Sequence, residues 1–142
     1  MRYDLERFKK AQTQDYGNAL REIRNGRKKS HWMWYVFPQV RGLGSSPTAQ
    51  KYAIQSRQEA EEYEKDPVLG RRLREITEAL LAQKESDPVK IFGFPDVLKL
   101  RSCMTLFAAV SGENSVFQKV LDAYYQGEKD ERTLALLKHG SR

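Results

Sequence analysis

Hydrophobic residues recur at helical spacing along much of the chain. The clearest stripe consists of four aliphatic residues that share one face of a helix, Leu69, Leu73, Ile76 and Leu80. Shorter stripes of the same kind run through residues 15–25 and 115–127. No segment alternates hydrophobic and polar residues between hairpin turns, and Pro38 ends the one strand-forming stretch, residues 35–37. The pattern predicts a mainly α protein.

Capping residues predict where these helices begin and end. Serine, aspartate or proline marks starts near residues 4, 15, 46, 56, 66, 87, 94, 115 and 130, and glycine follows the expected ends at residues 26, 93, 112, 127 and 140. Ser56 and Glu59 form a capping box. Residues 4–11 and 15–25 are expected as two separate helices. Because we find no repeat and no linker, we expect a single compact domain, residues 1–142, of seven or eight short helices.

The composition fits such a domain. The chain has 142 residues, of which 39% are hydrophobic and 31% are charged, enough for one core. No apolar run approaches the ~18–20 residues of a membrane span, and the charged N-terminal residues contain no signal sequence, so we expect a cytoplasmic protein without a membrane partner. Two histidines and one cysteine make a poor metal set, and no metal or cofactor is expected. Cys103 lies in an apolar stretch, which favours a buried free thiol over a reactive nucleophile.

The charge is unevenly distributed along the chain. The net charge is +6. Residues 21–41 contain one acid, Glu22, against six basic residues, Arg21, Arg24, Arg27, Lys28, Lys29 and Arg41. Such a surface favours anionic partners. A well-solvated surface without a partner is the alternative explanation.

Residues 30–48, SHWMWYVFPQVRGLGSSPT, break the helical pattern. Both tryptophans of the protein lie here, in a composition that fits neither an amphipathic helix nor a strand. One interpretation is an aromatic plug that fills the core beneath a loop. The other is the wall of a binding pocket, in which Trp32 or Trp34 stacks on a base while His31 or Gln39 forms directional hydrogen bonds. We take this segment as the centre of the candidate site.

The second half of this segment has the composition of an anion-binding loop. Two glycines allow sharp turns that expose backbone N–H groups, and Ser46-Pro47 marks the start of a helix. A glycine-rich loop that leads into a helix N-terminus binds phosphate in many proteins. No Walker or dinucleotide fingerprint is present, and a plain loop explains the same residues. The candidate phosphate ligands are Arg41, Gly44, Ser45 and Ser46.

A second cluster lies on the predicted helix 95–111, which is apolar on most faces and is expected at the centre of the fold. It carries Lys99 and Arg101, both candidate ligand contacts. A buried guanidinium requires a partner. For Arg101 this partner is either an internal carboxylate, such as Asp66 or Asp96, or a ligand phosphate in a pocket shared with residues 42–46. Asp96, in the first turn, either complements the helix dipole or handles a proton in catalysis.

Three stretches of the chain, GRKKSHWMWYVFPQVRGLGSSPTAQKYAI, DPVLGRRL and DVLKLRSCMTLFAAV, resemble a bacterial family of unknown function that is sometimes labelled calpastatin. This resemblance covers nearly the whole chain. A weaker one is to the YbiA-like, or NADAR, superfamily of small helical N-glycosidases. It rests on the early aromatic loop, on Asp66–Arg71 and on Arg101–Met104, and it implies a YbiA-like fold that acts on ribosyl phosphates or on base-linked ADP-ribose. The Glu-His pair of those enzymes has no counterpart, because residues 45–52 contain no carboxylate.

The resulting hypothesis is that the protein binds, and hydrolyses, an N-glycosidic nucleotide-like ribosyl phosphate such as an ADP-ribose adduct. The reaction requires a carboxylate near the oxocarbenium-like sugar and a proton donor for the leaving base. His31 or Asp96 is the candidate that handles the proton. The partner is then a phosphorylated nucleotide-like small molecule or an ADP-ribosylated base. The alternative is a basic nucleic-acid-binding module without catalytic activity, which the aromatic and basic residues 21–41 also fit. A purely structural interaction protein is a third class that the sequence leaves open.

Overall fold

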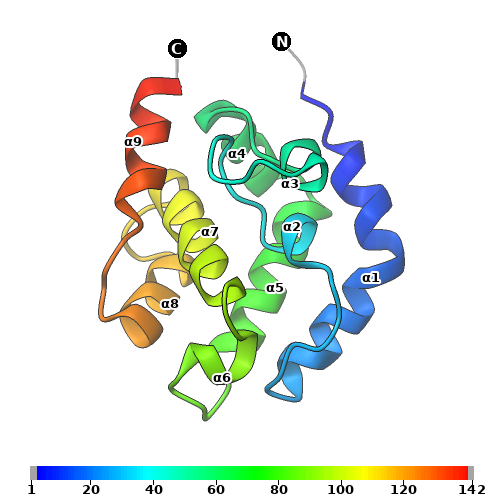
Figure 1. Cartoon of the computed structure of the whole chain (residues 1–142), viewed down its shortest axis with the longest axis vertical. Coiled ribbons are helices and arrows are strands. Elements are labelled where there is room, and N and C mark those ends of the chain that lie inside the picture. The colour runs from blue at the N-terminus through cyan, green and yellow to red at the C-terminus, as the bar shows by residue number, and fades with distance from the viewer. Residues whose placement is uncertain (1–2, 141–142) are drawn as a thin grey trace.

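The computed structural model describes residues 3–140, the last two without their side chains, and these residues form nine helices (Figure 1). In chain order they are α1 (Glu6–Arg24), α2 (Met33–Val36), α3 (Pro47–Lys51), α4 (Arg57–Lys65), α5 (Leu69–Leu81), α6 (Pro88–Phe92), α7 (Asp96–Ser111), α8 (Val116–Tyr125) and α9 (Glu131–Gly140). The described residues contain no strand, only an isolated bridge between Val40 and Ile54. None of their helices has the length and apolar composition needed to cross a membrane. The mainly helical fold is confirmed, with α2 as a single turn in the segment that the sequence pattern left irregular.

Residues 6–24 form one long helix where the sequence predicts two short ones. The buried face of α1 continues without a break through Phe8, Gln12, Tyr16, Ala19 and Ile23. In its middle, the Gln12 amide donates hydrogen bonds to the Tyr35 carbonyl and to the Tyr63 hydroxyl. Asp15 caps no helix because it lies inside α1, where its carboxylate accepts a hydrogen bond from the Tyr35 hydroxyl. Helix α1 begins without a side-chain cap from Asp4. Tertiary packing therefore overrides the expected break.

Most of the other expected helix starts are confirmed, because capping depends on residues close in sequence. The hydroxyls of Ser46, Ser56 and Ser115 each accept the N–H group three residues ahead. The carboxylates of Asp66 and Asp87 each accept the N–H group two residues ahead. These bonds satisfy backbone donors that the first turn of a helix otherwise leaves unpaired.

Helix α7 lies at the centre of the fold, as its apolar sequence predicts. Figure 1 shows α8 and α9 on one side of it and α2 and α5 on the other, and α7 packs against α4, α6, α8 and α9. Its buried side chains include Leu100, Cys103, Met104, Leu106 and Phe107. Burial raises the pKa of the Cys103 thiol well above its usual value. The expectation of a buried free thiol is therefore confirmed.

Residues 25–46 cross one face of the molecule between α1 and α7 (Figure 1). The Lys28 N–H donates to the Ile91 carbonyl at 2.7 Å, which fastens the start of this crossing to α6. Further along, the Ile54 N–H donates to the Gln39 carbonyl at 2.8 Å. The crossing places the aromatic segment 30–48 beside the first turn of α7, where the candidate site forms.

Candidate functional site

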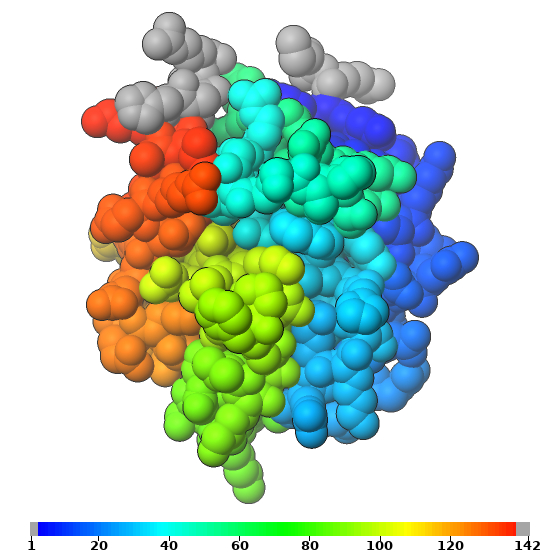
Figure 2. All heavy atoms as spheres, viewed as in Figure 1, coloured from blue at the N-terminus to red at the C-terminus, as the bar shows by residue number. Residues whose placement is uncertain are grey.

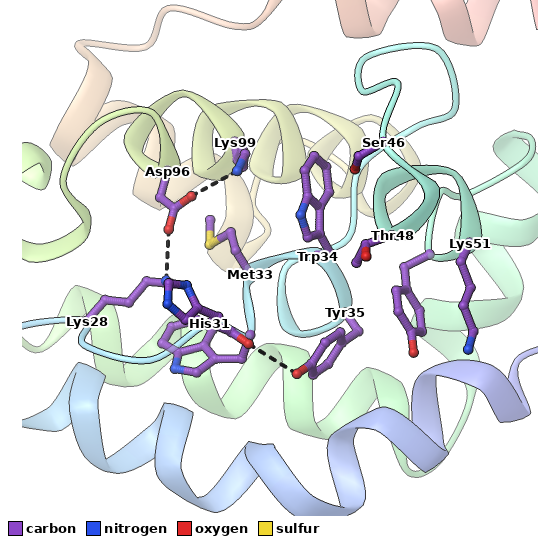
Figure 3. Close-up of a pocket in the computed structure, with 12 residues that line it drawn as sticks. Lys28, His31, Met33, Trp34, Tyr35, Ser46, Thr48, Lys51, Asp96 and Lys99 are labelled. Atoms are coloured by element: carbon purple, nitrogen blue, oxygen red, sulfur yellow. Dashed lines mark hydrogen bonds and ion pairs between the residues drawn. The ribbon is translucent and has the colours of Figure 1, made fainter.

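A pocket of about 580 Å³ opens to solvent between α2, α3 and the start of α7 (Figure 3). On the surface, the blue-to-cyan residues of the crossing segment meet the yellow-green start of α7 on the same face (Figure 2). The lining is basic, aromatic and hydroxyl-bearing, and consists of Lys28, His31, Trp32, Met33, Trp34, Tyr35, Ser46, Thr48, Lys51, Tyr52, Asp96 and Lys99.

Asp96 joins two lysines inside this pocket. Its Oδ2 lies 2.8 Å from Nζ of Lys28, and its Oδ1 lies 3.1 Å from Nζ of Lys99. The Lys28 side chain is 8% exposed and that of Asp96 is 18% exposed. Burial by itself raises the pKa of Asp96, but the hydrogen bonds and charges of the two lysines outweigh it and hold the pKa below its usual range. Asp96 is therefore a carboxylate at neutral pH.

The two tryptophans have different environments. Trp32 is at the floor of the pocket but only 1% exposed, so it belongs to the core. Trp34 is half-buried, and its ring forms part of the wall. Each ring lies against a lysine bound to Asp96: Nζ of Lys28 is 4.9 Å from the Trp32 centroid, and Nζ of Lys99 is 4.4 Å from the Trp34 centroid. The sequence left an aromatic plug and a pocket wall as alternatives. Trp32 fits the plug, and Trp34 fits the wall.

Glu22, near the end of α1, fixes the loop that carries His31 and Trp32. Its Oε1 accepts the backbone N–H groups of Lys29 at 2.7 Å and Ser30 at 3.0 Å, and the indole N–H of Trp32 at 2.9 Å. Burial raises the pKa of Glu22, but these bonds and one from the Ser30 hydroxyl outweigh it and lower the pKa to about 2. The sequence pattern marked Glu22 only as the lone acid of a basic stretch, because its partners follow in a loop whose path the pattern does not predict.

The opposite wall is formed by Tyr35 of α2 and by α3 with the residue after it. The ring centroids of Tyr35 and Tyr52 are 5.1 Å apart, and Nζ of Lys51 lies 5.4 Å from the Tyr52 centroid. Burial, followed by the hydrogen bond that its hydroxyl donates to Asp15, raises the pKa of Tyr35, so this phenol stays protonated. Figure 3 shows Lys51 at the end of the pocket away from Asp96.

The structure brings together some of the predicted site residues and not others. Those that line the pocket are His31, Trp32, Trp34, Ser46, Asp96 and Lys99. Those outside the lining are Gln39, Arg41, Gly44, Ser45 and Arg101. Arg41 and Ser45 are exposed. Gln39 is 6% exposed, its Nε2 has no hydrogen-bond partner among the described residues, and it lines a much smaller cavity of about 10 Å³ behind Trp34.

The glycine-rich loop contacts Trp34 closely at Gly44. A Cβ at this position would lie 2.7 Å from Cβ of Ala49 and 3.0 Å from Cη2 of Trp34, so packing alone accounts for the glycine. At the start of α3 the Ser46 hydroxyl already accepts the Ala49 N–H, and Pro47 has no N–H to offer. Few free backbone donors remain there, and the groups that reach the pocket are the side chains of Ser46 and Thr48.

Arg101 does not join this pocket. It lies two residues after Lys99 on α7, a spacing that turns its side chain to a different face of the helix. Its Nε is buried without a hydrogen-bond partner among the described residues. The two carboxylates considered from the sequence are paired elsewhere, Asp66 with Lys9 and Asp96 with Lys28 and Lys99. Among the described residues, Arg101 therefore does not line the pocket that Ser46 lines, and it joins neither of those ion pairs.

The sequence analysis did not propose six of the lining residues as site residues. Lys28 counted there only toward the positive charge of residues 21–41. The other five are Met33, Tyr35, Thr48, Lys51 and Tyr52. A signal for three of them exists: Thr48, Lys51 and Tyr52 follow the Ser46 cap at positions that share one helical face. Among the described residues, no three His, Cys, Asp or Glu side chains gather into a group that could hold a metal ion.

Fold and site together define an all-helical protein with a basic, aromatic pocket on one face. The chain belongs to the family described as "Protein of unknown function (DUF1810)", which matches residues 2–137. It is similar to the crystal structure of the conserved hypothetical protein Rv1873 from Mycobacterium tuberculosis, at 48% identity over 96% of this chain and 97% of that chain, with a TM-score of 0.93. A comparison with curated proteins found no match. Membership of a family of unknown function is thus shown, whereas neither the family match nor the structural neighbour supports the calpastatin label or the resemblance to NADAR N-glycosidases.

Proposed function

We propose that the pocket binds a phosphorylated, nucleotide-like small molecule. The observation that carries the proposal is Trp34, whose half-buried ring lines a pocket of about 580 Å³ together with three lysines. Aromatic rings stack on nucleobases, and pockets of roughly 300–1,000 Å³ hold small molecules. A flat aromatic surface beside concentrated positive charge suits a base joined to a phosphate.

The charge of the pocket supports an anionic ligand. Three lysines and one aspartate line it, which gives a net charge of +2 with His31 neutral. The whole chain carries a net charge of +6, which adds long-range attraction for anions. The exposed hydroxyls of Ser46 and Thr48 supply neutral hydrogen-bond donors at the rim.

We also propose that the bound ligand, such as an ADP-ribose adduct or another ribosyl phosphate, loses its base by hydrolysis. The C1′–N bond breaks, and the base leaves with the bonding electrons and takes up a proton. Water adds to C1′ of the oxocarbenium-like sugar and releases one proton, so that one water molecule is consumed and the proton donor is restored. Asp96 is the one acid in the lining, and its carboxylate would stabilise the positive charge that develops on the sugar. His31, exposed at the pocket, would deliver the proton to the base. Asp96 is ill suited to donate that proton, because Lys28 and Lys99 keep its carboxyl group ionised.

Thermal shift followed by titration calorimetry tests binding, with the four common nucleoside monophosphates and ADP-ribose as probes. A ligand at 100 times its Kd adds about 2.7 kcal/mol of stability. Trp34→Ala is expected to weaken binding about tenfold, the scale of one stacked base. Phe94→Ala is the matched control, since its ring is 75% exposed and lies outside the pocket. The binding proposal is wrong if no probe binds saturably, or if both variants bind like the unmodified protein.

Chromatography of the free base tests hydrolysis. Asp96→Asn is expected to slow base release by about 10²-fold, the scale of one lost electrostatic contact to a transition state. If no base is released from any probe that binds, the pocket is a binding site only.

The nucleic-acid module is a second candidate because five basic side chains of the segment 21–41 are exposed, Arg21, Arg24, Arg27, Lys29 and Arg41. Random single-stranded oligonucleotides distinguish the two functions. A nucleic-acid module predicts binding that falls steeply with salt and that weakens when Arg21 and Arg24 are changed to alanine. A mononucleotide pocket predicts that those two substitutions leave the binding of the mononucleotide unchanged.

A further inference from the structure

Two of the three lysines in the pocket are already committed within the protein. Nζ of Lys28 binds Asp96 at 2.8 Å and the Ser30 carbonyl at 2.6 Å. Nζ of Lys99 binds the other oxygen of Asp96 at 3.1 Å and lies over the Trp34 ring. This carboxylate offsets one of their two positive charges, and a ligand phosphate that approached them would also approach Asp96.

Lys51 is different. Its side chain is exposed, and no carboxylate pairs with it among the residues that the structure describes. Ser46 and Thr48 lie on the same side of the pocket (Figure 3). The Ser46 hydroxyl accepts the Ala49 N–H and keeps its own O–H to donate. In Figure 3 the Lys51 ammonium group points away from the two hydroxyls, but its exposed side chain is free to turn toward them. In that rotamer, one ammonium group and two hydroxyl donors suit a single phosphoryl group.

Trp34 lies between these two ends. Figure 3 shows Lys99 on one side of the indole and Ser46 and Thr48 on the other. Because Nζ of Lys99 occupies one face at 4.4 Å from the centroid, a base can stack only on the opposite face, toward Thr48. The far edge of the ring lies beside Gly44, where an added Cβ would come within 3.0 Å of Cη2.

We propose that the ligand class is a nucleoside monophosphate, with its base against the free face of Trp34 and its phosphoryl group at Lys51, Ser46 and Thr48. This inference rests on the proposed binding function and narrows it. Because the base lies on the face of Trp34 away from Lys99 and Asp96, the pose concerns binding and not the hydrolytic step that uses Asp96. The net charge of +2 in the lining balances a phosphomonoester, which carries about −1.5 to −2 at pH 7. A second phosphoryl group, as in a nucleoside diphosphate or ADP-ribose, meets no further free cation of the lining and faces the carboxylate of Asp96 on the other side.

Titration calorimetry with AMP, GMP, CMP and UMP, and then with the nucleoside, the diphosphate and the ADP-ribose form of the base that binds best, tests this. The monophosphate is expected to bind at least tenfold more tightly than the nucleoside, and at least as tightly as the diphosphate or the ADP-ribose form. Lys51→Ala is expected to weaken monophosphate binding about tenfold and nucleoside binding less than twofold. Lys65→Ala, which removes an exposed lysine from α4, should change neither.

These measurements separate a failure of the monophosphate assignment from a failure of the binding proposal. If the diphosphate or ADP-ribose binds tenfold more tightly than the monophosphate, or if Lys51→Ala leaves monophosphate binding unchanged while Trp34→Ala weakens it, the monophosphate assignment is wrong and the binding proposal stands. If none of the nucleotides binds saturably to the unmodified protein, both are wrong.

Discussion

The carboxylate of Asp96 lies 2.8 Å from Nζ of Lys28, and this ion pair ties the loop after α1 to the first turn of α7. The same carboxylate binds Lys99, and each of the two lysines packs on one tryptophan ring. Asp96 is therefore linked to both tryptophans through its two lysines, and Glu22 holds Trp32 directly through the indole N–H. The network connects three segments that line the pocket, and several expectations follow from it.

Replacement of Asp96 by asparagine is expected to lower the free energy of unfolding by about 1–3 kcal/mol, because the 8% exposed Lys28 side chain loses its counter-charge. The folded-state pKa of Asp96 lies below its ordinary value of 3.8. Its contribution is therefore fully present above that value and is lost as the pH falls through the folded pKa. Urea denaturation between pH 2 and pH 7 should show that acid lowers the free energy of unfolding less in Asp96→Asn than in the unmodified protein. Glu113→Gln, at an exposed site, serves as the control, and equal urea midpoints for the two variants would contradict the expectation.

Glu22 should contribute to stability across a defined pH window. Its pKa is about 2 in the folded state against an ordinary value of 4.5. The contribution is present above pH 4.5 and is lost as the pH falls toward 2. Glu22→Gln should cost about 1–2 kcal/mol at neutral pH, shift the fluorescence of Trp32, and flatten the acid side of the stability profile. An unchanged profile would show that the loop 29–32 holds without this carboxylate.

Gly44→Ala is expected to displace Trp34. Because the added methyl group would lie 3.0 Å from Cη2 of Trp34 and 2.7 Å from Cβ of Ala49, something must move, at a cost of about 1–3 kcal/mol. Ligand affinity should fall together with the change in tryptophan fluorescence. A variant with unaltered fluorescence and melting temperature would show that the loop adapts without moving the ring.

Gly17→Ala, unlike Gly44→Ala, is expected to raise the free energy of unfolding. Gly17 lies inside α1, and a Cβ there meets nothing within 4 Å. Alanine in a helix interior is favoured over glycine by about 0.5–1 kcal/mol. A rise in the urea midpoint of this size is expected, and a fall would mean that α1 is not continuous at this position in solution.

Cys103 should be unreactive in the folded protein. It is fully buried, and burial raises the pKa of its thiol, so little thiolate forms and reagents cannot reach it. A colourimetric thiol reagent is expected to label the protein only as urea unfolds it. Rapid labelling without denaturant would contradict the buried position.

Local sequence determined the helices and most of their starts. Capping serines and aspartates act on N–H groups two or three residues away, and the stripe from Leu69 to Leu80 needs only the helical period to indicate a buried face. The unusual composition of residues 30–48 marked the region of the pocket, because aromatic residues without a helical or strand period require another explanation. What the pattern could not separate was the core tryptophan from the exposed one, since both occur in the same few residues.

Tertiary structure alone determined the continuity of α1 and the composition of the pocket. The continuity of α1 depends on Gln12, whose partners Tyr35 and Tyr63 lie in other elements. The lining of the pocket combines Lys28, which pairs with Asp96, and Lys51, which pairs with no carboxylate in the part of the chain that the structure describes. Arg101, two residues from Lys99, falls outside it through helical geometry. Sequence patterns record periodicity and nearest neighbours, whereas contacts between segments distant along the chain depend on how whole helices pack, and those contacts shape the site.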